Sequence, residues 1–129
     1  LLTFADSART WTAKPLRPGP RVTRGLTGLL SRLNAFGGTN LYAGLVAALE
    51  MEGQTYGDAA LPKIDELFVL SDGEPTSGPA RDADTLCELV AEANKYAKVR
   101  INAVFTGVGG GGALLKRLAE ENGGVYVQR

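Results

Sequence analysis

The sequence predicts an α/β fold in three layers: a doubly wound, mostly parallel sheet with helices on both faces and one antiparallel strand at its edge. Two observations predict it. Short apolar runs alternate with helical patterns of roughly 10 to 17 residues, and parallel strands need crossovers of about that length. One run, Ile64–Leu70, is almost continuously apolar after its acidic start, which is typical of a strand covered on both faces.

The length and composition indicate a single domain over residues 1–129. A chain of this size buries about two thirds of the surface that its unfolded form exposes, which suits one core. Hydrophobic residues make up 44% of the chain and charged residues 22%, close to ordinary globular usage. We therefore expect one folded unit.

The first part of the chain predicts a hairpin and then a helix. Leu1–Phe4 and Arg9–Ala13 have strand character and are separated by a polar turn. Three prolines and a glycine between residues 15 and 20 break the chain. Apolar residues then recur at helical spacing towards Phe36: Val22, Leu26, Leu29, Leu30 and Leu33.

A second helix is expected after the turn at Gly37-Gly38. Its apolar residues are Leu41, Leu45, Val46, Ala48 and Leu49. Thr39 or Asn40 is expected to cap it, because either side chain has an oxygen that accepts hydrogen bonds from free amide groups of the first turn. Residues Gly53–Pro62 are expected to form a loop.

The second half of the chain predicts strands that alternate with helices. The expected elements are strand Ile64–Leu70, helix Asp82–Lys98, strand Ile101–Phe105, helix Ala113–Asn122 and strand Val125–Val127. This β-α-β-α-β order is the connectivity of a parallel sheet.

Charge and hydropathy indicate neither a nucleic-acid partner nor membrane insertion by this segment. Fourteen basic residues balance fourteen acidic ones, so no overall field attracts polyanions. No apolar run approaches the roughly twenty residues that span a bilayer. The charges are nevertheless segregated, because residues 1–36 hold six bases and one acid, whereas residues 50–92 hold eleven acids and two bases. The cellular compartment is left open.

The absence of histidine excludes most hydrolase mechanisms within this chain. Ser-His-Asp and Cys-His sites, and metal sites built on imidazole, all need that side chain. The single cysteine, Cys87, lies in an apolar helical pattern and is expected to be a buried hydrophobic residue. Most hydrolase templates are therefore removed for this chain.

Two short turns, Gly37-Gly38-Thr39-Asn40 and Ser71-Asp72-Gly73, indicate a cation site. The Asp72 turn follows a predicted strand, and ligands bind beyond the carboxyl ends of strands in open α/β sheets. The Thr39 hydroxyl and the Asp72 carboxylate are oxygens of the kind that Mg²⁺ prefers. Each residue also has an ordinary structural interpretation, Thr39 as a helix cap and Asp72 as a turn residue that accepts nearby amides. Two further oxygen donors in the loop are interpreted as exposed: Glu74 and Thr76.

These segments resemble the von Willebrand factor type A family over nearly the whole chain. Phe36–Leu45 is similar to the family's threonine segment, and Leu67–Gly73 to its second aspartate segment. The resemblance implies that Thr39 ligates Mg²⁺ or Mn²⁺ through its hydroxyl and that Asp72 binds the ion directly or through water. It also implies a metal-ion-dependent adhesion site, that is, a non-enzymatic protein-binding module for adhesion or assembly in which a partner's carboxylate completes the metal coordination.

The chain departs from the family at its first metal segment. The family's Asp-x-Ser-x-Ser sequence has no match here, because in Asp6-Ser7-Ala8 the serine follows the aspartate immediately. We expect the chain to start after the family's first strand and helix and to lack its last helix. The ligand set would then be incomplete and metal binding weak, and Leu1–Phe4 and Ile64–Leu70 would lack the neighbouring strand that they share in the family.

Two alternatives from other functional classes remain. Gly107–Gly112 satisfies G-x-G-x-x-G between a strand and a helix, which is typical of nucleotide-binding loops. A flexible glycine turn is the favoured explanation, because only 17 residues follow Gly112 and they leave no room for a ribose-binding acid. Asp72 to Thr76 has a superficial similarity to the nucleophile motif of haloacid dehalogenase phosphatases, in which Asp72 would be the nucleophile.

Overall fold

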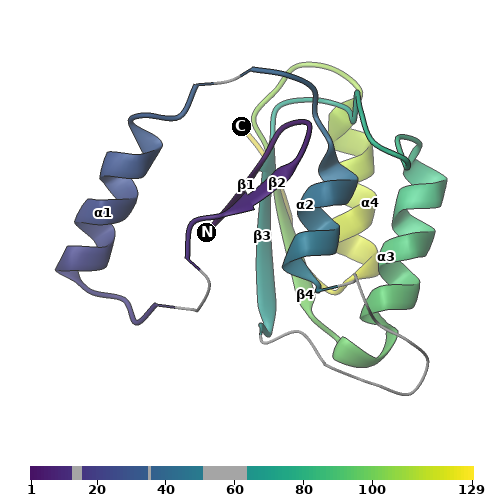
Figure 1. Cartoon of the computed structure of the whole chain (residues 1–129). Helices are drawn as coiled ribbons and strands as arrows, with labels where there is room; N and C mark the ends of the chain where they lie inside the picture. The colour runs from purple at the N-terminus through teal and green to yellow at the C-terminus, as the bar shows by residue number, and fades with distance from the viewer. Residues whose placement is uncertain (13–15, 35, 51–63) are drawn as a thin grey trace.

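The computed structural model describes residues 1–12, 16–34, 36–50 and 64–129, and in them it shows a mixed α/β architecture with four helices and five strands (Figure 1). In chain order these are β1 (Leu2–Phe4), β2 (Ala8–Thr10), α1 (Pro20–Leu30), α2 (Leu41–Ala48), β3 (Glu66–Ser71), α3 (Ala83–Ala97), β4 (Arg100–Phe105), α4 (Gly111–Glu121) and β5 (Tyr126–Gln128). Each lies close to an element that the sequence predicts. The predicted loop Gly53–Pro62 lies outside the described residues.

The three strands of the second half form a parallel sheet in the order β3-β4-β5. Leu67 of β3 pairs with Ile101 of β4, and Ala103 of β4 pairs with Tyr126 of β5. Helix α3 connects the first pair and α4 the second, so each parallel pair is joined by a helical crossover. The predicted α/β class with a parallel sheet is therefore confirmed.

The antiparallel edge strand predicted for this sheet is not present among the described residues, so that part of the prediction is wrong for them. Strands β1 and β2 make a separate two-stranded sheet in which Leu2 lies opposite Thr10. Among the described residues, no strand lies between β1 and β3 and pairs with both, so the two sheets are not joined. The hairpin packs instead on α2, where the ring of Phe4 fills the space beside Gly44.

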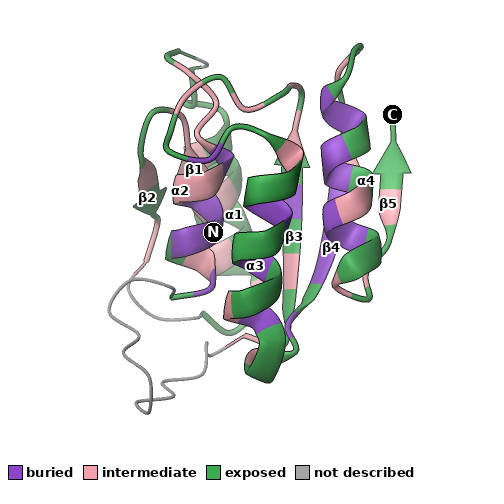
Figure 2. Ribbon diagram, turned by 90° about the vertical axis from the view of Figure 1, so that its right-hand side faces the viewer, coloured by how far each residue is buried: buried purple, intermediate pink, exposed green. Residues whose placement is uncertain are grey.

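The hydrophobic core lies on one face of the parallel sheet. Alternate side chains of a strand point to opposite faces, and on β4 Ile101, Ala103 and Phe105 point to the same side. All three are buried, together with Leu115 and Leu118 of α4, which packs over β4. Figure 2 shows buried positions concentrated on the sides of α3 and α4 that face the sheet.

The opposite face of the sheet is uncovered within the described residues, so the prediction of a strand covered on both faces is wrong for β3. Phe68 is 63% exposed and Leu70 is 60% exposed. Helix α1 lies on this side of the molecule but stands away from the sheet (Figure 1), and none of its residues is buried. An apolar run shows that a strand has two apolar faces, but it does not show that the chain supplies a helix to each.

A buried amide joins the end of α3 to the start of β4. Asn94 is 7% exposed, and its Nδ2 donates to the carbonyl of Val99 and to Oδ1 of Asn122, each at 2.7 Å. Its Oδ1 accepts from the backbone amide of Val99 at 2.7 Å. This polar side chain satisfies backbone groups that the αβ turn would otherwise leave buried and unpaired.

Candidate functional site

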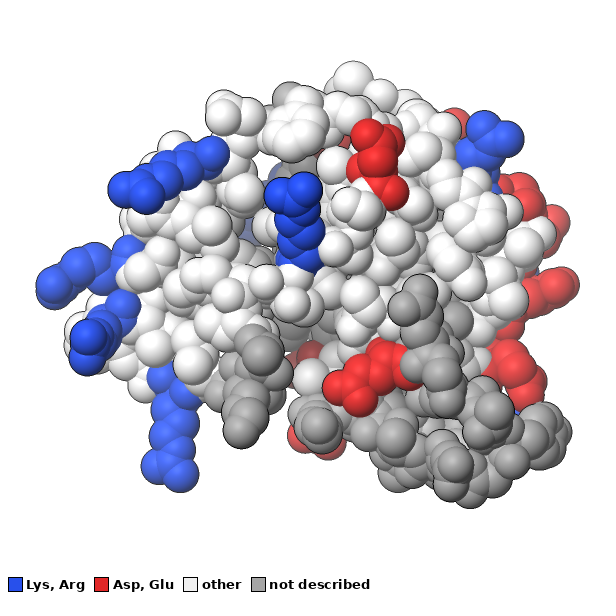
Figure 3. All heavy atoms as spheres, viewed as in Figure 1, with Lys and Arg blue, Asp and Glu red and all other residues white. Residues whose placement is uncertain are grey.

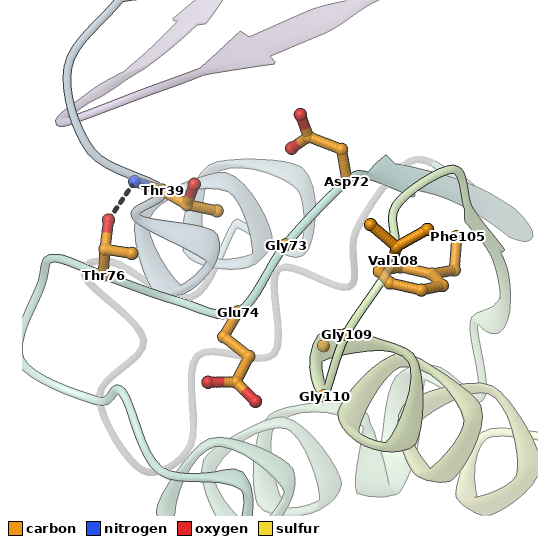
Figure 4. Close-up of a pocket in the computed structure, with 10 residues that line it drawn as sticks. Thr39, Asp72, Gly73, Glu74, Thr76, Phe105, Val108, Gly109 and Gly110 are labelled. Carbon is orange, nitrogen blue, oxygen red and sulfur yellow. Dashed lines mark hydrogen bonds between the residues drawn. The ribbon is translucent and has the colours of Figure 1, made fainter.

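A hollow of about 410 Å³ opens beyond the carboxyl ends of β3 and β4 (Figure 4). Three chain segments line it, with the residues Thr39, Asp72, Gly73, Glu74, Thr76, Phe105, Val108, Gly109, Gly110 and Gly111. The structure therefore brings both predicted metal ligands, Thr39 and Asp72, to one rim, although they are 33 positions apart in the sequence.

Thr39 is held in place by its backbone. Its amide donates to Oγ1 of Thr76 at 2.8 Å, and the Thr76 amide donates to the Thr39 carbonyl at 3.0 Å. The helix cap predicted for Thr39 or Asn40 is made by Asn40, whose Oδ1 accepts from the Ala43 amide at 3.0 Å. The Thr39 hydroxyl is thus not used as the cap, and it makes no hydrogen bond to another described residue.

Asp72 is the first residue after β3. The strand's last carbonyl, that of Ser71, accepts from the Thr106 amide at 3.0 Å, which fixes the point where the chain leaves the sheet. The Asp72 carboxylate is exposed and makes no hydrogen bond or ion pair with another described residue. Figure 4 shows it on the side of the rim that faces the hairpin, whereas Glu74 points the opposite way. The turn interpretation, in which Asp72 accepts nearby amides, is therefore not the one that this structure shows.

Asp6 is a structural residue of the rim that the sequence did not reveal. One of its carboxylate oxygens, Oδ1, accepts from the Gly38 amide at 2.8 Å and from the Ser77 hydroxyl at 3.4 Å. It ties the hairpin to two of the three segments that line the hollow, the one with Thr39 and the one with Asp72. The sequence excluded Asp6 as a metal ligand because its spacing to Ser7 does not fit the motif, and it offered no signal for this bridging role.

Thr76 is a second structural residue of this region whose role the sequence did not reveal. The sequence predicted only that it is an exposed loop residue. Its hydroxyl accepts the Thr39 amide, so it fixes one candidate ligand relative to the loop that carries the other. An exposed threonine in a loop with Gly and Pro gives no local indication of a partner 37 residues away.

The glycines of the Gly107–Gly112 loop allow two loops to pack closely. A Cβ at Gly111 would lie 2.5 Å from the carbonyl carbon of Gly73 and 2.7 Å from the amide nitrogen of Glu74. A Cβ at Gly107 would overlap the carbonyl oxygen of Asp72. Because these glycines are required by contact with the Asp72 loop, a bound nucleotide is not needed to explain them.

The donor atoms at the rim suit a hard divalent cation but are few. A threonine hydroxyl and a carboxylate are oxygen ligands of the type that Mg²⁺ and Mn²⁺ take, with water in the remaining positions. In the part of the chain that the structure describes, no three Asp, Glu, Cys or His side chains are grouped as a metal site. A cation held here would have one anionic protein ligand.

Cys87 is buried in α3, as predicted. Burial among apolar groups raises the pKa of its thiol, with the charge of Glu121 contributing in the same direction. The thiol therefore stays protonated at neutral pH and acts as a core residue.

No protein-family model matches this chain, and no curated protein matches it significantly. None of the described helices is both long enough and apolar enough to cross a bilayer.

Proposed function

We propose that residues 1–129 form a non-enzymatic protein-binding module, similar to a von Willebrand factor type A domain, that holds Mg²⁺ or Mn²⁺ weakly at Thr39 and Asp72. A carboxylate of a partner protein completes the coordination of the ion. The von Willebrand-like fold, with its first strand and last helix lacking, is part of this proposal.

One observation carries the proposal: two oxygen ligands from separate elements line the same hollow, and neither is engaged by another described residue. The Thr39 hydroxyl has two acceptor lone pairs that the fold leaves available. The Asp72 carboxylate supplies the negative charge. Asp6, in contrast, accepts hydrogen bonds from Gly38 and Ser77 and so holds the loops together. Asp6 is therefore the structural carboxylate of this region, and Asp72 is the one available to an ion.

The partner's carboxylate follows from the chemistry of the ion. A divalent cation with one protein carboxylate keeps a net positive charge, and it exchanges a coordinated water for an anionic oxygen more favourably than for a neutral one. Asp72 lines the hollow and is exposed, so an acidic side chain from outside can reach it. The ion would then link the two proteins and make their association depend on metal.

Binding of the ion to the isolated chain is expected to be weak, with a Kd of roughly millimolar, because calcium and magnesium affinity follows the number of charged ligands and the rigidity of the site. NMR line broadening by Mn²⁺ is suited to such weak binding. We expect amide signals of residues 38–40 and 72–73 to broaden first during a titration.

The variants Asp72→Asn and Thr39→Val remove one ligand each and are expected to abolish this localised broadening. Glu74→Gln is the matched control, since Glu74 lines the same hollow but points away from the other two residues (Figure 4). Broadening that is equal in Asp72→Asn and the unmodified chain would refute the site.

A further inference from the structure

Asn122 is the only asparagine in this sequence that a glycine follows. The chain has five asparagines, and the other four precede alanine, leucine, lysine and alanine. Glycine has no Cβ, so nothing on Gly123 hinders approach of its backbone nitrogen to the side-chain carboxamide of Asn122. Asparagine followed by glycine is therefore the pair most prone to deamidation, and this chain has one such pair.

Deamidation of such a pair proceeds through a cyclic succinimide. The Gly123 nitrogen loses its proton and bonds to Cγ of Asn122, while the bond from Cγ to Nδ2 breaks and ammonia leaves. Water then opens the ring at either carbonyl carbon and leaves aspartate or isoaspartate. In isoaspartate the main chain runs through Cγ, so it is longer by a methylene group.

Hydrogen bonds hold both ends of the Asn122 carboxamide in the folded chain. Its Oδ1 accepts from Nδ2 of Asn94 at 2.7 Å, and its Nδ2 donates to the Leu118 carbonyl at 2.8 Å. Leu118 is four residues earlier, so the carboxamide points back along α4 and away from Gly123. Asn94 is buried and bonded to Val99 through both of its side-chain polar atoms, so this partner is itself held in place. Attack on Cγ requires the carboxamide to rotate, which breaks these hydrogen bonds.

The backbone around the attacking nitrogen is fixed as well. The Gly123 amide donates to the Glu120 carbonyl at 3.4 Å, and the Gly124 amide donates to the Ala119 carbonyl at 2.9 Å. Gly123 has a φ of +67°, the left-handed conformation with which many helices end. Ring closure therefore requires the end of α4 to open first, and local opening of this kind costs less than global unfolding.

Conversion of Asn122 disturbs the chain just before β5. A Cβ at Gly124 would overlap the carbonyl oxygen of Ile101, so the backbone here lies directly against β4. An isoaspartate inserts its extra methylene just before Gly123 and displaces this backbone. An aspartate instead places a carboxylate oxygen where Nδ2 donated to the Leu118 carbonyl, and two acceptors repel each other.

Either product also adds a negative charge in an unfavourable place. Asn122 is the C-cap of α4, and the partial negative charge of a helix C-terminus disfavours a carboxylate there. Glu120 and Glu121 immediately precede it. Figure 3 shows Asp and Glu gathered mainly over the side of the molecule that α3 occupies, and α4 packs against α3. The added charge therefore makes the end of α4 less stable.

We propose that Asn122 is a latent modification site. Its hydrogen bond with Asn94 keeps the carboxamide intact while α4 is folded to its end, and deamidation after local opening loosens β5 from the sheet. The site is independent of the proposed metal site, because Asn122 follows the last turn of α4, whereas the start of that helix lines the hollow.

The modification is tested by peptide mapping of the chain with mass spectrometry after incubation in mildly alkaline buffer. In about 6 M guanidinium chloride, Asn122 should be converted before any other asparagine, and Gly123→Ala should suppress this conversion because its Cβ hinders the attack. In the folded chain the conversion should be at least roughly tenfold slower, since only the locally opened fraction reacts. Equal rates in the folded and the denatured chain would overturn the proposal.

The role of Asn94 is tested by Asn94→Ala, which removes the donor to Oδ1 of Asn122. Leu45→Ala is the matched control, because Leu45 is buried in α2 and its truncation lowers global stability without removing a hydrogen bond of Asn122. At denaturant concentrations that give the two variants the same folded fraction, Asn122 should be converted at least roughly threefold faster in Asn94→Ala. Equal rates in the two variants would show that Asn94 does not protect the site.

The consequence for β5 is tested on the deamidated chain, which anion exchange separates from the unmodified one by its added charge. Amide hydrogen exchange at residues 124–128 should be at least roughly tenfold faster in the product. Unchanged exchange there would contradict the loosening of β5. This measurement and the comparison of folded with denatured chain use no variant, so they decide the proposal even if Asn94→Ala fails to fold.

Discussion

Replacement of Gly111 by alanine tests whether contact between loops fixes the rim of the candidate site. The new Cβ would lie 2.5 Å from the Gly73 carbonyl carbon, whereas nonbonded carbons are normally about 3.5–4.0 Å apart. The loop after β3 or the start of α4 must therefore move by at least about 1 Å. Both sides of the contact are backbone, so no side chain can rotate out of the way.

The expected cost follows from two opposed terms. Overpacking in a close-packed region costs about 1–3 kcal/mol, and alanine regains up to about 1 kcal/mol of helix propensity over glycine. We therefore expect Gly111→Ala to lower the free energy of unfolding by about 1–2 kcal/mol. The displaced loop carries Asp72, so the same variant should also reduce Mn²⁺ broadening at residues 38–40.

Urea unfolding followed by circular dichroism measures the first effect, with the m-value checked for constancy. Gly73→Ala is the matched control, because a Cβ at Gly73 meets no atom within 4 Å and that glycine adjoins the same contact. It should be neutral or slightly stabilising. If Gly111→Ala were as stable as Gly73→Ala, close packing of the two loops would not be what positions Asp72.

Four further outcomes are expected. Asn94→Ala should lower the free energy of unfolding by about 2–4 kcal/mol in urea titrations, because it leaves the buried amide and carbonyl of Val99 unpaired; a loss below about 1 kcal/mol would contradict this. Asn40→Ala should cost about 0.5–2 kcal/mol in the same assay through loss of the α2 cap, and no change would show that the cap is dispensable. Hydrogen bonds from Thr85 lower the pKa of Asp82 below 3.8, so the stability that Asp82 contributes is present above pH 4 and is lost as the pH falls through its lower folded pKa. The melting temperature of the unmodified chain should therefore fall more steeply with acid than that of Asp82→Asn. Parallel curves of melting temperature against pH would contradict this. The chain should not hydrolyse an aryl phosphate in a phosphatase assay. Hydrolysis that is lost in Asp72→Asn would favour the alternative in which Asp72 is a nucleophile.

The sequence predicted the elements of the second half well, because their signals are local. The apolar run of β3 and the 3.6-residue pattern of α3 both lie within short windows. Their order then implied the parallel sheet through the crossover rule. Asp72 could be placed at the carboxyl-end rim of the sheet for the same reason. Thr39 follows no strand of this sheet, and it was assigned to the same rim from its position in a turn before a helix.

Contacts between segments that are distant in the chain could not be predicted from the sequence. The bridge from Asp6 to Gly38 and Ser77 depends on where the hairpin packs, and nothing near Asp6 encodes that position. Exposure of Phe68 depends on whether a helix covers it, and an apolar strand looks the same in either case. The Gly107–Gly112 loop has the glycine spacing of a phosphate-binding site, but Gly107 and Gly111 are required because the backbone of the Asp72 loop lies too close for a Cβ.

A crystal structure with Mn²⁺ present, analysed through the metal's anomalous scattering, tests the central claim most directly. The proposed function predicts one anomalous peak at the rim, roughly 2–2.5 Å from the Thr39 hydroxyl oxygen and either at that distance from an Asp72 oxygen or joined to it by one water. A peak confined to other carboxylates, with none between Thr39 and Asp72 at millimolar Mn²⁺, would contradict it.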